Sequence, residues 1–304
     1  MKKISTAVMS IMLAVSLYSC ASSQSVTNTY TDLQPAATIT YQTFYDELSP
    51  YGSWIDYPGY GYVWSPSVAD FQPYYTNGYW LSTDLGWNWN SNYGWGWAPF
   101  YYGRWFYETG YGWLWLPGYE WAPAWVCWRN NVDFYGWAPL APGMDLGISI
   151  SINIPFEHWT FVDHRFLADH NFINHCVDNN RKETVYSHTT IINNASYTKN
   201  KTVFAKGPEV KEVGKYSGQR ITPLAIREHN QPAINSINND KNELKVFKPE
   251  IRQREEGNMA KPGNTMQYKD LPHDNQQRGT WAIPEKHPTQ REVPKENHKR
   301  RNRE

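Results

Sequence analysis

Alternating aromatic positions dominate residues 51–143 and predict β-strands there. Trp113 and Trp115 alternate with Leu114 and Leu116. Because successive side chains of a strand point to opposite faces, the two pairs are expected on opposite faces of one strand. Polar or glycine-containing turns at residues 56–59, 83–86 and 108–110 each lie between two such runs. This succession of strand, turn and strand is typical of a β-hairpin.

Two series of tryptophans repeat along this block with nearly the same period. The first is spaced by 26 and 25 residues and consists of Trp54, Trp80 and Trp105. The second is spaced by 25, 26 and 22 residues and consists of Trp64, Trp89, Trp115 and Trp137. In the shortened last unit, Trp125 or Trp128 is the earlier partner of Trp137. The sequence therefore predicts an all-β fold of four tandem tryptophan-rich hairpins, forming a small barrel or a sandwich-like array of sheets.

The first residues have the pattern of a lipoprotein signal peptide, assigned to residues 1–19. Lys2 and Lys3 precede an apolar run over residues 7–17 that is too short to span a bilayer. The following Leu-Tyr-Ser-Cys resembles the lipobox of bacterial lipoproteins, which implies a lipid anchor on Cys20. An ordinary secretory signal followed by a chance cysteine is the alternative. Residues 20–43 are rich in Ser, Thr, Gln and Ala, which predicts a flexible tether.

The chain after the aromatic block divides into two parts. Residues 144–228 are expected to form a β-rich extension that packs on the repeat domain of residues 44–143. Its predicted strands are the alternating run through Ile148, Ile150, Ile152 and Ile154, and residues 159–162 and 184–192. Core-forming residues then become rare, and residues 241–304 carry 15 Lys plus Arg against 10 Asp plus Glu, a net charge of +5. A disordered basic tail is therefore predicted for residues 229–304.

The charge of the aromatic block argues against a nucleic-acid partner. Residues 51–143 hold 32 aromatic residues but only two cations, Arg104 and Arg129, against six acids. The whole chain has no net formal charge. Proteins that bind single-stranded nucleic acid combine stacking rings with a basic groove. Nucleic acid is therefore excluded from the expected partners.

The order of the aromatic motifs is similar to that of a known group of proteins. The series YGSW, GYVWSP, NGYW, GWGWAPFYYGRW, GWLWLPG, WAPAWVCWR and GWAPL resembles the uncharacterised tryptophan-rich exported proteins and lipoproteins of Gram-negative bacteria. The later KNKTVFAKGPEVKEV and ITPLAIRE resemble the stretch that follows the aromatic block in their Bacteroidetes members. The similarity covers about residues 45–228. It implies no activity and no catalytic residue, because the family is defined by sequence and not by function.

A histidine series is the first candidate for chemistry outside the block. It consists of His158, His164, His170 and His175, and an aspartate directly precedes two of them. Imidazoles with carboxylates are metal ligands or acid–base partners. Spacings of five and six residues place at least one pair on opposite sides of a helix or strand, so solvated or hydrogen-bonding histidines are the default. His164, His170 and His175 remain weak metal candidates, and no cofactor is expected.

Cys127 and Cys176 are the two cysteines that follow the signal region. An oxidising compartment allows a disulfide between them, and a buried free thiol at Cys127 is the alternative.

The aromatic rings are expected to serve both as core and as surface. The 93 residues of the block contain only ten Leu, Ile and Val, so rings have to supply most of the core. Their number nevertheless exceeds what one inner face of eight short strands accommodates, which predicts a second layer or an exposed patch. Trp115 is expected in the core because it belongs to a series, and Trp121 is a candidate platform because it belongs to neither. The candidate ligand-binding residues are Trp95, Trp97, Tyr101, Tyr119 and Trp121.

The expected function is noncatalytic binding or scaffolding by a lipid-anchored protein of the cell envelope. A wall or surface glycan is the favoured ligand, because exposed rings match the apolar faces of sugars. The first alternative is an interaction module for another envelope protein, and the second is an enzyme that uses the histidine series. The sequence contains no Gly-X-Ser-X-Gly elbow, no His-Glu-X-X-His and no phosphate loop. Residues 22–24 are not an acidic export signal, so the expected location is the outer membrane, facing the periplasm.

Overall fold

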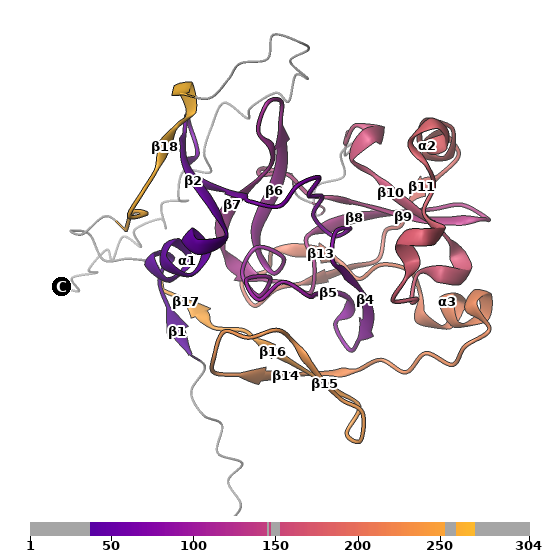
Figure 1. Cartoon of the computed structure of the whole chain (residues 1–304). Coiled ribbons are helices and arrows are strands. Elements are labelled where there is room, and N and C mark those ends of the chain that lie inside the picture. Colours follow the sequence, from indigo (N-terminus) through magenta and orange to yellow (C-terminus); the bar gives the residue numbers. More distant parts are fainter. Residues whose placement is uncertain (1–36, 145, 147–152, 253–259, 271–304) are drawn as a thin grey trace, which may run out of the picture. The chain divides into compact units, whose positions relative to one another are not determined.

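Four β-hairpins follow one another along the aromatic block, as the tryptophan spacing predicts. The computed structural model describes residues 37–144, 146, 153–252 and 260–270 (Figure 1). The hairpins are β2 (Gly52–Tyr57) with β3 (Gly61–Pro66), β4 (Gly78–Thr83) with β5 (Gly86–Ser91), β6 (Tyr102–Glu108) with β7 (Gly112–Trp121), and β8 (Val126–Asn130) with β9 (Phe134–Pro139).

The two tryptophan series face each other across these hairpins. The directly opposed pairs are Trp54 with Trp64, Trp80 with Trp89, Trp105 with Trp115, and Trp128 with Trp137. The earlier partner of Trp137 is therefore Trp128 and not Trp125. Aromatic residues placed directly opposite each other stabilise antiparallel pairs, so the repeat in the sequence is also the register of the sheets.

The hairpins are distributed over three separate sheets rather than one closed sheet. The first and third join in the order β18-β2-β3-β7-β6, where β18 is Met266–Gln267. The fourth joins two later strands in the order β10-β9-β8-β11, where β10 is Thr160–Asp163 and β11 is Thr190–Ile191. The second hairpin, β4-β5, pairs with no other strand of the described chain. The sandwich-like array is thus the alternative that the structure supports.

One core, here called the tryptophan core, lies between these sheets. It contains all eight tryptophans of the cross-strand pairs, each at most 1% exposed. On the five-stranded sheet, Trp113 and Trp115 face this core, whereas Leu114 and Leu116 belong to a separate cluster with Ile55 and other residues. The predicted alternation of faces is therefore confirmed.

The chain before the first hairpin is structured from residue 38 onward, which corrects the predicted end of the tether at residue 43. β1 (Thr38–Ile39) pairs with β17 (Glu250–Ile251), and α1 (Tyr41–Leu48) and η1 (Ser49–Tyr51) follow. Apolar residues at positions 41, 44, 45 and 48 have helical spacing. Phe44, Tyr45 and Leu48 are buried in the tryptophan core. Residues 1–36, which include the predicted signal peptide and Cys20, lie outside the described chain.

The predicted extension, residues 144–228, contains helices as well as strands. Its elements are η2 (Phe156–His158), β10, η3 (His164–Phe166), η4 (Phe172–His175), α2 (Asn179–Ser187), β11, β12 (Ala195–Tyr197), β13 (Val203–Ala205), α3 (Val210–Ser217) and β14 (Ala225–His229). β10 confirms the strand predicted over residues 159–162. The strand predicted over residues 184–192 is wrong up to residue 187, where α2 forms because the Asp178 side chain caps its first turn by accepting from the Arg181 amide. The strand predicted around residue 150 falls largely outside the described residues, although Ile154 is buried.

Regular structure also continues into the stretch predicted as a tail from residue 229. β14, β16 (Glu243–Phe247) and β15 (Ser236–Asn238) form a sheet in the order β14-β16-β15, and β17, β18 and η5 (Tyr268–Asp270) follow. Leu244 and Val246 alternate with charged residues in β16 and are fully buried. β16 pairs with β14 on one side and with β15 on the other, so this short alternating run is enough to form a central strand. The predicted start of a disordered tail at residue 229 is therefore wrong. Residues 253–259 and 271–304 lie outside the described part. Within the described chain, no helix combines the length and apolar character needed to cross a membrane.

Candidate functional site

Trp121 differs in burial from every other tryptophan of the aromatic block. Thirteen of the fourteen tryptophans in residues 51–143 are buried, and Trp121 alone keeps part of its surface exposed. Of the two predicted alternatives, a second layer or an exposed patch, the structure therefore supports further packing for tryptophan, because loop residues as well as strand residues turn their rings into the core. Trp121 is the last residue of β7 and marks the candidate site.

A local irregularity between β6 and β7 places Trp121 and its neighbours. Tyr102 pairs with Trp121 and Arg104 pairs with Leu116, so one residue of β6 faces four residues of β7. Gly103 adopts φ +72°, and a Cβ on it would lie 2.0 Å from the Leu116 carbonyl oxygen. Glycine is therefore required where the two strands come this close. The extra residues of β7 bulge outward, which brings Tyr119 and Glu120 to the surface.

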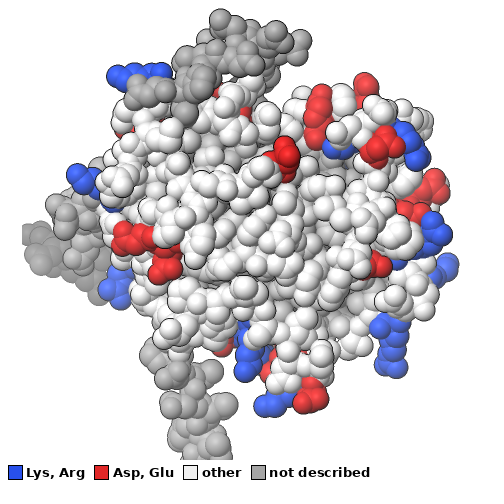
Figure 2. Space-filling view, in the orientation of Figure 1, with Lys and Arg blue, Asp and Glu red and all other residues white. Residues whose placement is uncertain are grey.

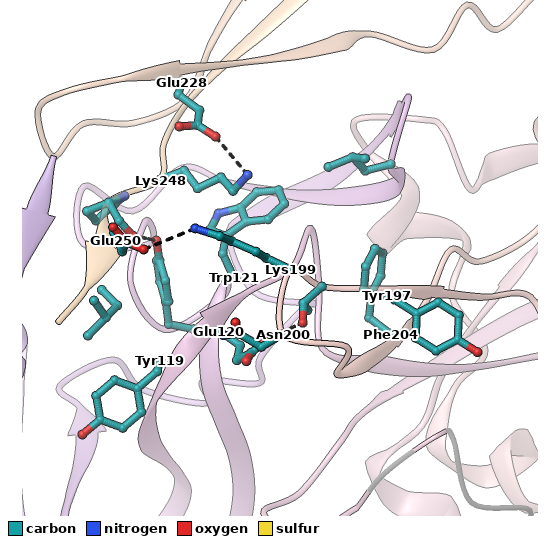
Figure 3. A pocket seen from close by; sticks show the side chains of 15 residues that line it. Tyr119, Glu120, Trp121, Tyr197, Lys199, Asn200, Phe204, Glu228, Lys248 and Glu250 are labelled. Carbon is teal, nitrogen blue, oxygen red and sulfur yellow. Dashed lines mark hydrogen bonds and ion pairs between the residues drawn. The ribbon is translucent and has the colours of Figure 1, made fainter. Parts of the chain in front are cut away.

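The bulge forms one wall of an open groove of about 620 Å³ (Figure 3). A second wall comes from the β12–β13 hairpin, and a third from the ends of β14 and β16 and from β17 (Figure 3). The groove is lined by residues 119–121 of β7, residues 197–200 and Phe204 of the hairpin, Glu228 and residues 248–251 of the third wall, and Leu85 and Tyr102. It therefore combines aromatic rings with charged and amide side chains.

Ion pairs and hydrogen bonds connect the polar side chains of the groove. Lys248 Nζ lies 2.9 Å from Glu228 Oε1, and Lys199 Nζ lies 3.4 Å from Glu250 Oε1 (Figure 3). The Thr198 hydroxyl donates to Glu120. Three carboxylates and two ammonium groups thus line the same space, and such an arrangement suits noncovalent recognition of a polar ligand with an apolar face.

A buried tyrosine joins the third wall to the aromatic block. The Tyr102 hydroxyl donates to the Pro249 carbonyl oxygen over 2.6 Å. Burial raises the pKa of Tyr102 well above its usual range, and the nearby Glu228 carboxylate adds to this effect. The hydroxyl therefore stays protonated and remains a donor at every physiological pH.

Of the five predicted ligand-binding residues, the structure brings Tyr119 and Trp121 into the groove. The other three, Trp95, Trp97 and Tyr101, are between 1% and 4% exposed and belong to the tryptophan core, so these three predictions are wrong. Buried rings have no face free to stack on a ligand. Sequence spacing did not reveal their burial, because all three lie in the connection between β5 and β6, which folds inward.

The tryptophan ring at the groove is contacted on both faces. Tyr101 stacks behind Trp121 with ring centroids 5.6 Å apart and an interplanar angle of 25°. On the groove side, Lys248 Nζ lies 4.9 Å from the centroid of the indole (Figure 3). The buried indole Nε1 of Trp121 has no hydrogen-bond partner.

The four histidines of the predicted series are dispersed, and each contacts an aromatic ring. His170 stacks on Tyr79 and His175 on Phe166, at centroid distances of 3.9 and 3.5 Å. His164 is buried between Tyr135 and Tyr216, and burial lowers its pKa. In the part of the chain that the structure describes, no three His, Cys, Asp or Glu side chains are placed to hold a metal ion. The candidates His164, His170 and His175 therefore do not form one site.

The two cysteines are free, so the structure does not contain the disulfide considered from the sequence. Cys127 packs in a cluster with Ala138 and Phe161, whereas Cys176 packs against the tryptophan core on the opposite face of the four-stranded sheet. Burial raises the pKa of both thiols to about 12. Both thiols are therefore protonated and unreactive at neutral pH.

Several residues of the groove were not among the sequence candidates. Tyr197 and Lys199 lie in the predicted extension, and Glu228, Lys248 and Glu250 lie at or beyond its end. The alternation of Leu244 and Val246 directly before Lys248 was the signal that a strand leads to this wall. The sequence does not indicate that this strand lies beside the aromatic block, because more than 100 residues separate the two.

Comparison with known proteins finds a family match over the aromatic block alone. No curated protein and no solved structure matches the chain. The family match includes Trp121 and the bulge but neither of the other two walls of the groove. Residues 45–144 match the model of a family of unknown function, DUF6600.

Proposed function

We propose that this protein is a noncatalytic binding protein of the cell envelope and that its groove holds a glycan. Sugars present flat faces of CH groups that stack on aromatic rings, and their hydroxyls bond to carboxylates and amides. The groove offers Trp121, Tyr119 and Tyr197 as rings, together with Glu120 and Asn200 as polar partners. Tyr197 is 67% exposed, so its ring is accessible to a ligand.

The contrast in burial between Trp121 and all other tryptophans of the block carries this proposal. The block buries thirteen indoles completely or nearly so. It leaves part of one indole accessible, in the groove that also collects two ion pairs. Exposed apolar surface is unfavourable in water, and its concentration at one polar groove is typical of a binding site.

The envelope location is part of the proposal and derives from the sequence. Lys2 and Lys3, the apolar run that follows them and Cys20 support a lipid anchor, which would hold the protein at the outer membrane on the periplasmic side. The motif series supports a relation to tryptophan-rich exported lipoproteins of Gram-negative bacteria, with a Bacteroidetes-type member as the nearest pattern. Mass analysis of the mature protein for a diacylated Cys20 tests this part.

A sedimentation assay with insoluble peptidoglycan tests the binding proposal. We expect the full mature chain to bind, and the Trp121→Ala variant to bind about tenfold more weakly, because one stacking platform is removed. Tyr51→Ala is the matched control, since Tyr51 is 47% exposed and lies outside the groove. Equal binding by wild type and Trp121→Ala would contradict the proposal.

A protein interface is the second candidate function. The distribution of charged residues favours such an interface on a part of the surface outside the groove. Between residues 57 and 103 the only charged residues are Asp70 and Asp84. Figure 2 shows that the middle of one face carries few charged side chains. Interface centres are depleted in charge. If the part of the surface formed by residues 57–103 binds an envelope protein, Asn92→Lys, at an exposed position of this stretch, is expected to reduce crosslinking to envelope proteins and to leave glycan binding unchanged.

A further inference from the structure

The groove side of the Trp121 ring is covered by a cation from the chain itself. Lys248 Nζ lies 4.9 Å from the indole centroid, and Tyr101 closes the opposite face. The same ammonium makes an ion pair with Glu228 at 2.9 Å. An aromatic face and a carboxylate therefore converge on one primary ammonium group (Figure 3).

The surrounding charges also favour a cation at this position. Glu120, Glu228 and Glu250 line the groove together with Lys199 and Lys248. If the Lys248 ammonium leaves, three carboxylates face one remaining cation, which itself pairs with Glu250. A tryptophan face beside carboxylates attracts a positively charged ammonium group more strongly than it attracts an uncharged group such as an acetamide.

Lys248 is held loosely enough to exchange. Its side chain is 33% exposed and that of Glu228 is 45% exposed. Ion pairs at this exposure are weak, because water competes for both charges and the long side chain loses rotamer freedom. The flexible stem of a lysine lets its ammonium move into water while the backbone of the third wall stays in place.

We propose that Trp121, Glu228 and Lys248 form an ammonium site in which Lys248 occupies the place of a ligand amine. The ligand class is then a glycan that carries free primary amines, and such a ligand binds by displacing the Lys248 ammonium from the indole face. This inference rests on the proposed glycan-binding function and specifies its chemistry. No bond is formed or broken, since one ammonium replaces another.

Two oligosaccharides with the same backbone test the ammonium site. The probes are a glucosamine oligomer, which bears free amines, and an N-acetylglucosamine oligomer of equal length, measured by titration calorimetry on the full mature chain. We expect the amine-bearing oligomer to bind more tightly. Lys248→Met is expected to raise its affinity roughly fivefold, because the ligand no longer competes with an internal occupant.

Lys199→Met is the matched control for the lysine substitution. Lys199 lines the same groove and also pairs with a glutamate, but it makes no contact with the indole face among the cation–ring contacts of the described chain. It removes the same charge, so any general electrostatic gain appears in both variants. We expect its effect to stay within about twofold.

A second variant tests the carboxylate. Glu228→Gln is expected to weaken binding of the amine-bearing oligomer about tenfold while leaving the acetylated oligomer unaffected. Glu243→Gln, whose partner is Arg227 outside the groove, is its control. Circular dichroism and thermal unfolding verify that each variant is folded.

The outcomes separate this inference from the proposed function. Equal affinity for both oligomers, or equal gains in Lys248→Met and Lys199→Met, would overturn the ammonium site and leave glycan binding in place. Failure of both oligomers and of peptidoglycan to bind would overturn both. Preference for the amine-bearing oligomer with a gain confined to Lys248→Met would support the inference.

Discussion

The hairpin block, residues 52–139, and the region from residue 190 to residue 270 are built in different ways. Each hairpin of the block pairs strands that lie next to each other in the sequence, and opposed tryptophans occupy their centres. The later region is held by pairings with distant segments, such as β17 with β1 and β18 with β2, and its strands are short. Its surface carries partly exposed ion pairs, among them Lys199 with Glu250 and Lys248 with Glu228.

This difference explains the composition of the groove. The block supplies a wall on which Trp121 packs against the tryptophan core, and the later region supplies four of the five charged side chains of the groove. Rigid positioning of rings and loose positioning of charges are both useful where a ligand has to be admitted and then held. The groove lies where the two kinds of structure meet.

The largest effect is expected from truncating a ring of the core. Trp115 is fully buried, faces both Trp64 and Trp105 across the sheet, and donates its Nε1 to the Tyr102 carbonyl over 2.6 Å. Trp115→Ala is expected to lower the free energy of unfolding by about 3–5 kcal/mol. Trp121→Ala, at the end of the same strand, is expected to cost at least about 2 kcal/mol less, because its ring is partly exposed. Denaturant titration measures both free energies of unfolding. Equal losses would show that the ring at the groove contributes as much to stability as the ring in the core.

A second, smaller effect is expected at the bulge that connects the two regions. Gly103→Ala is expected to cost about 2–4 kcal/mol, because the new Cβ meets the Leu116 carbonyl oxygen at 2.0 Å in a left-handed conformation. Gly112 has a similar φ of +76° but nothing within 4 Å of the new Cβ. Gly112→Ala therefore measures backbone strain alone, about 1 kcal/mol. If the two variants unfold at the same denaturant concentration, the close contact at Gly103 has no energetic importance.

How far the sequence predicts the structure also differs between the two regions. In the block, the spacing of Trp54, Trp64 and their repeats predicts the hairpins, since a hairpin register depends on local sequence. The structure adds that the two series are directly opposed. The same spacing distinguishes Trp115 from Trp121 correctly. It does not predict the burial of Trp95 or Trp97, because no local pattern tells which way an aromatic loop turns.

In the later region, local patterns were insufficient. Residues 38–39 and 250–251 were assigned to a tether and a tail, because each stretch is polar by itself. They are ordered through pairing with each other, across more than 200 residues. The third wall of the groove, with Lys248 and Glu250, depends on this pairing and was therefore absent from the sequence candidates. Long-range pairings of short strands carry too little local signal to be inferred from one sequence.

A third effect, on pH dependence, is expected from a histidine that packs on the block from the chain between the two regions. Residues 51–143 contain no histidine, whereas His158 packs on Tyr107 and Trp113 from outside the block, and burial lowers its pKa from 6.5 to about 4. In the unfolded chain this histidine takes up a proton as the pH falls through 6.5, while the folded protein binds it only near pH 4. Stability is therefore lost as the pH falls from 7 to 4, by about 1–2 kcal/mol at pH 5.

His158→Phe keeps an aromatic ring and removes the titration. Unfolding free energies measured at pH 7 and pH 5 are expected to differ less in this variant than in wild type. Burial also lowers the pKa of His164, so part of the slope remains. An unchanged slope would mean that His158 is not the main acid-sensitive contact between the block and the extension.

The smallest effect on the free energy of unfolding is expected from the ion pairs of the later region, in contrast to the large effect expected from the tryptophan core. Arg227 Nε lies 3.0 Å from Glu243 Oε1, and the arginine side chain is 56% exposed. A double-mutant cycle with Arg227→Ala and Glu243→Ala is expected to give a coupling of about 1 kcal/mol or less, which falls further in 1 M salt. The pair joins β14 to β16, two strands that are already paired through their backbones, so it adds little that the ladder does not supply. A coupling as large as the loss from Trp115→Ala would mean that charges, and not the backbone ladder, hold β14 to β16. Exposed ion pairs of this region would then be strong, and a Lys248 paired with Glu228 would not give way to a ligand amine.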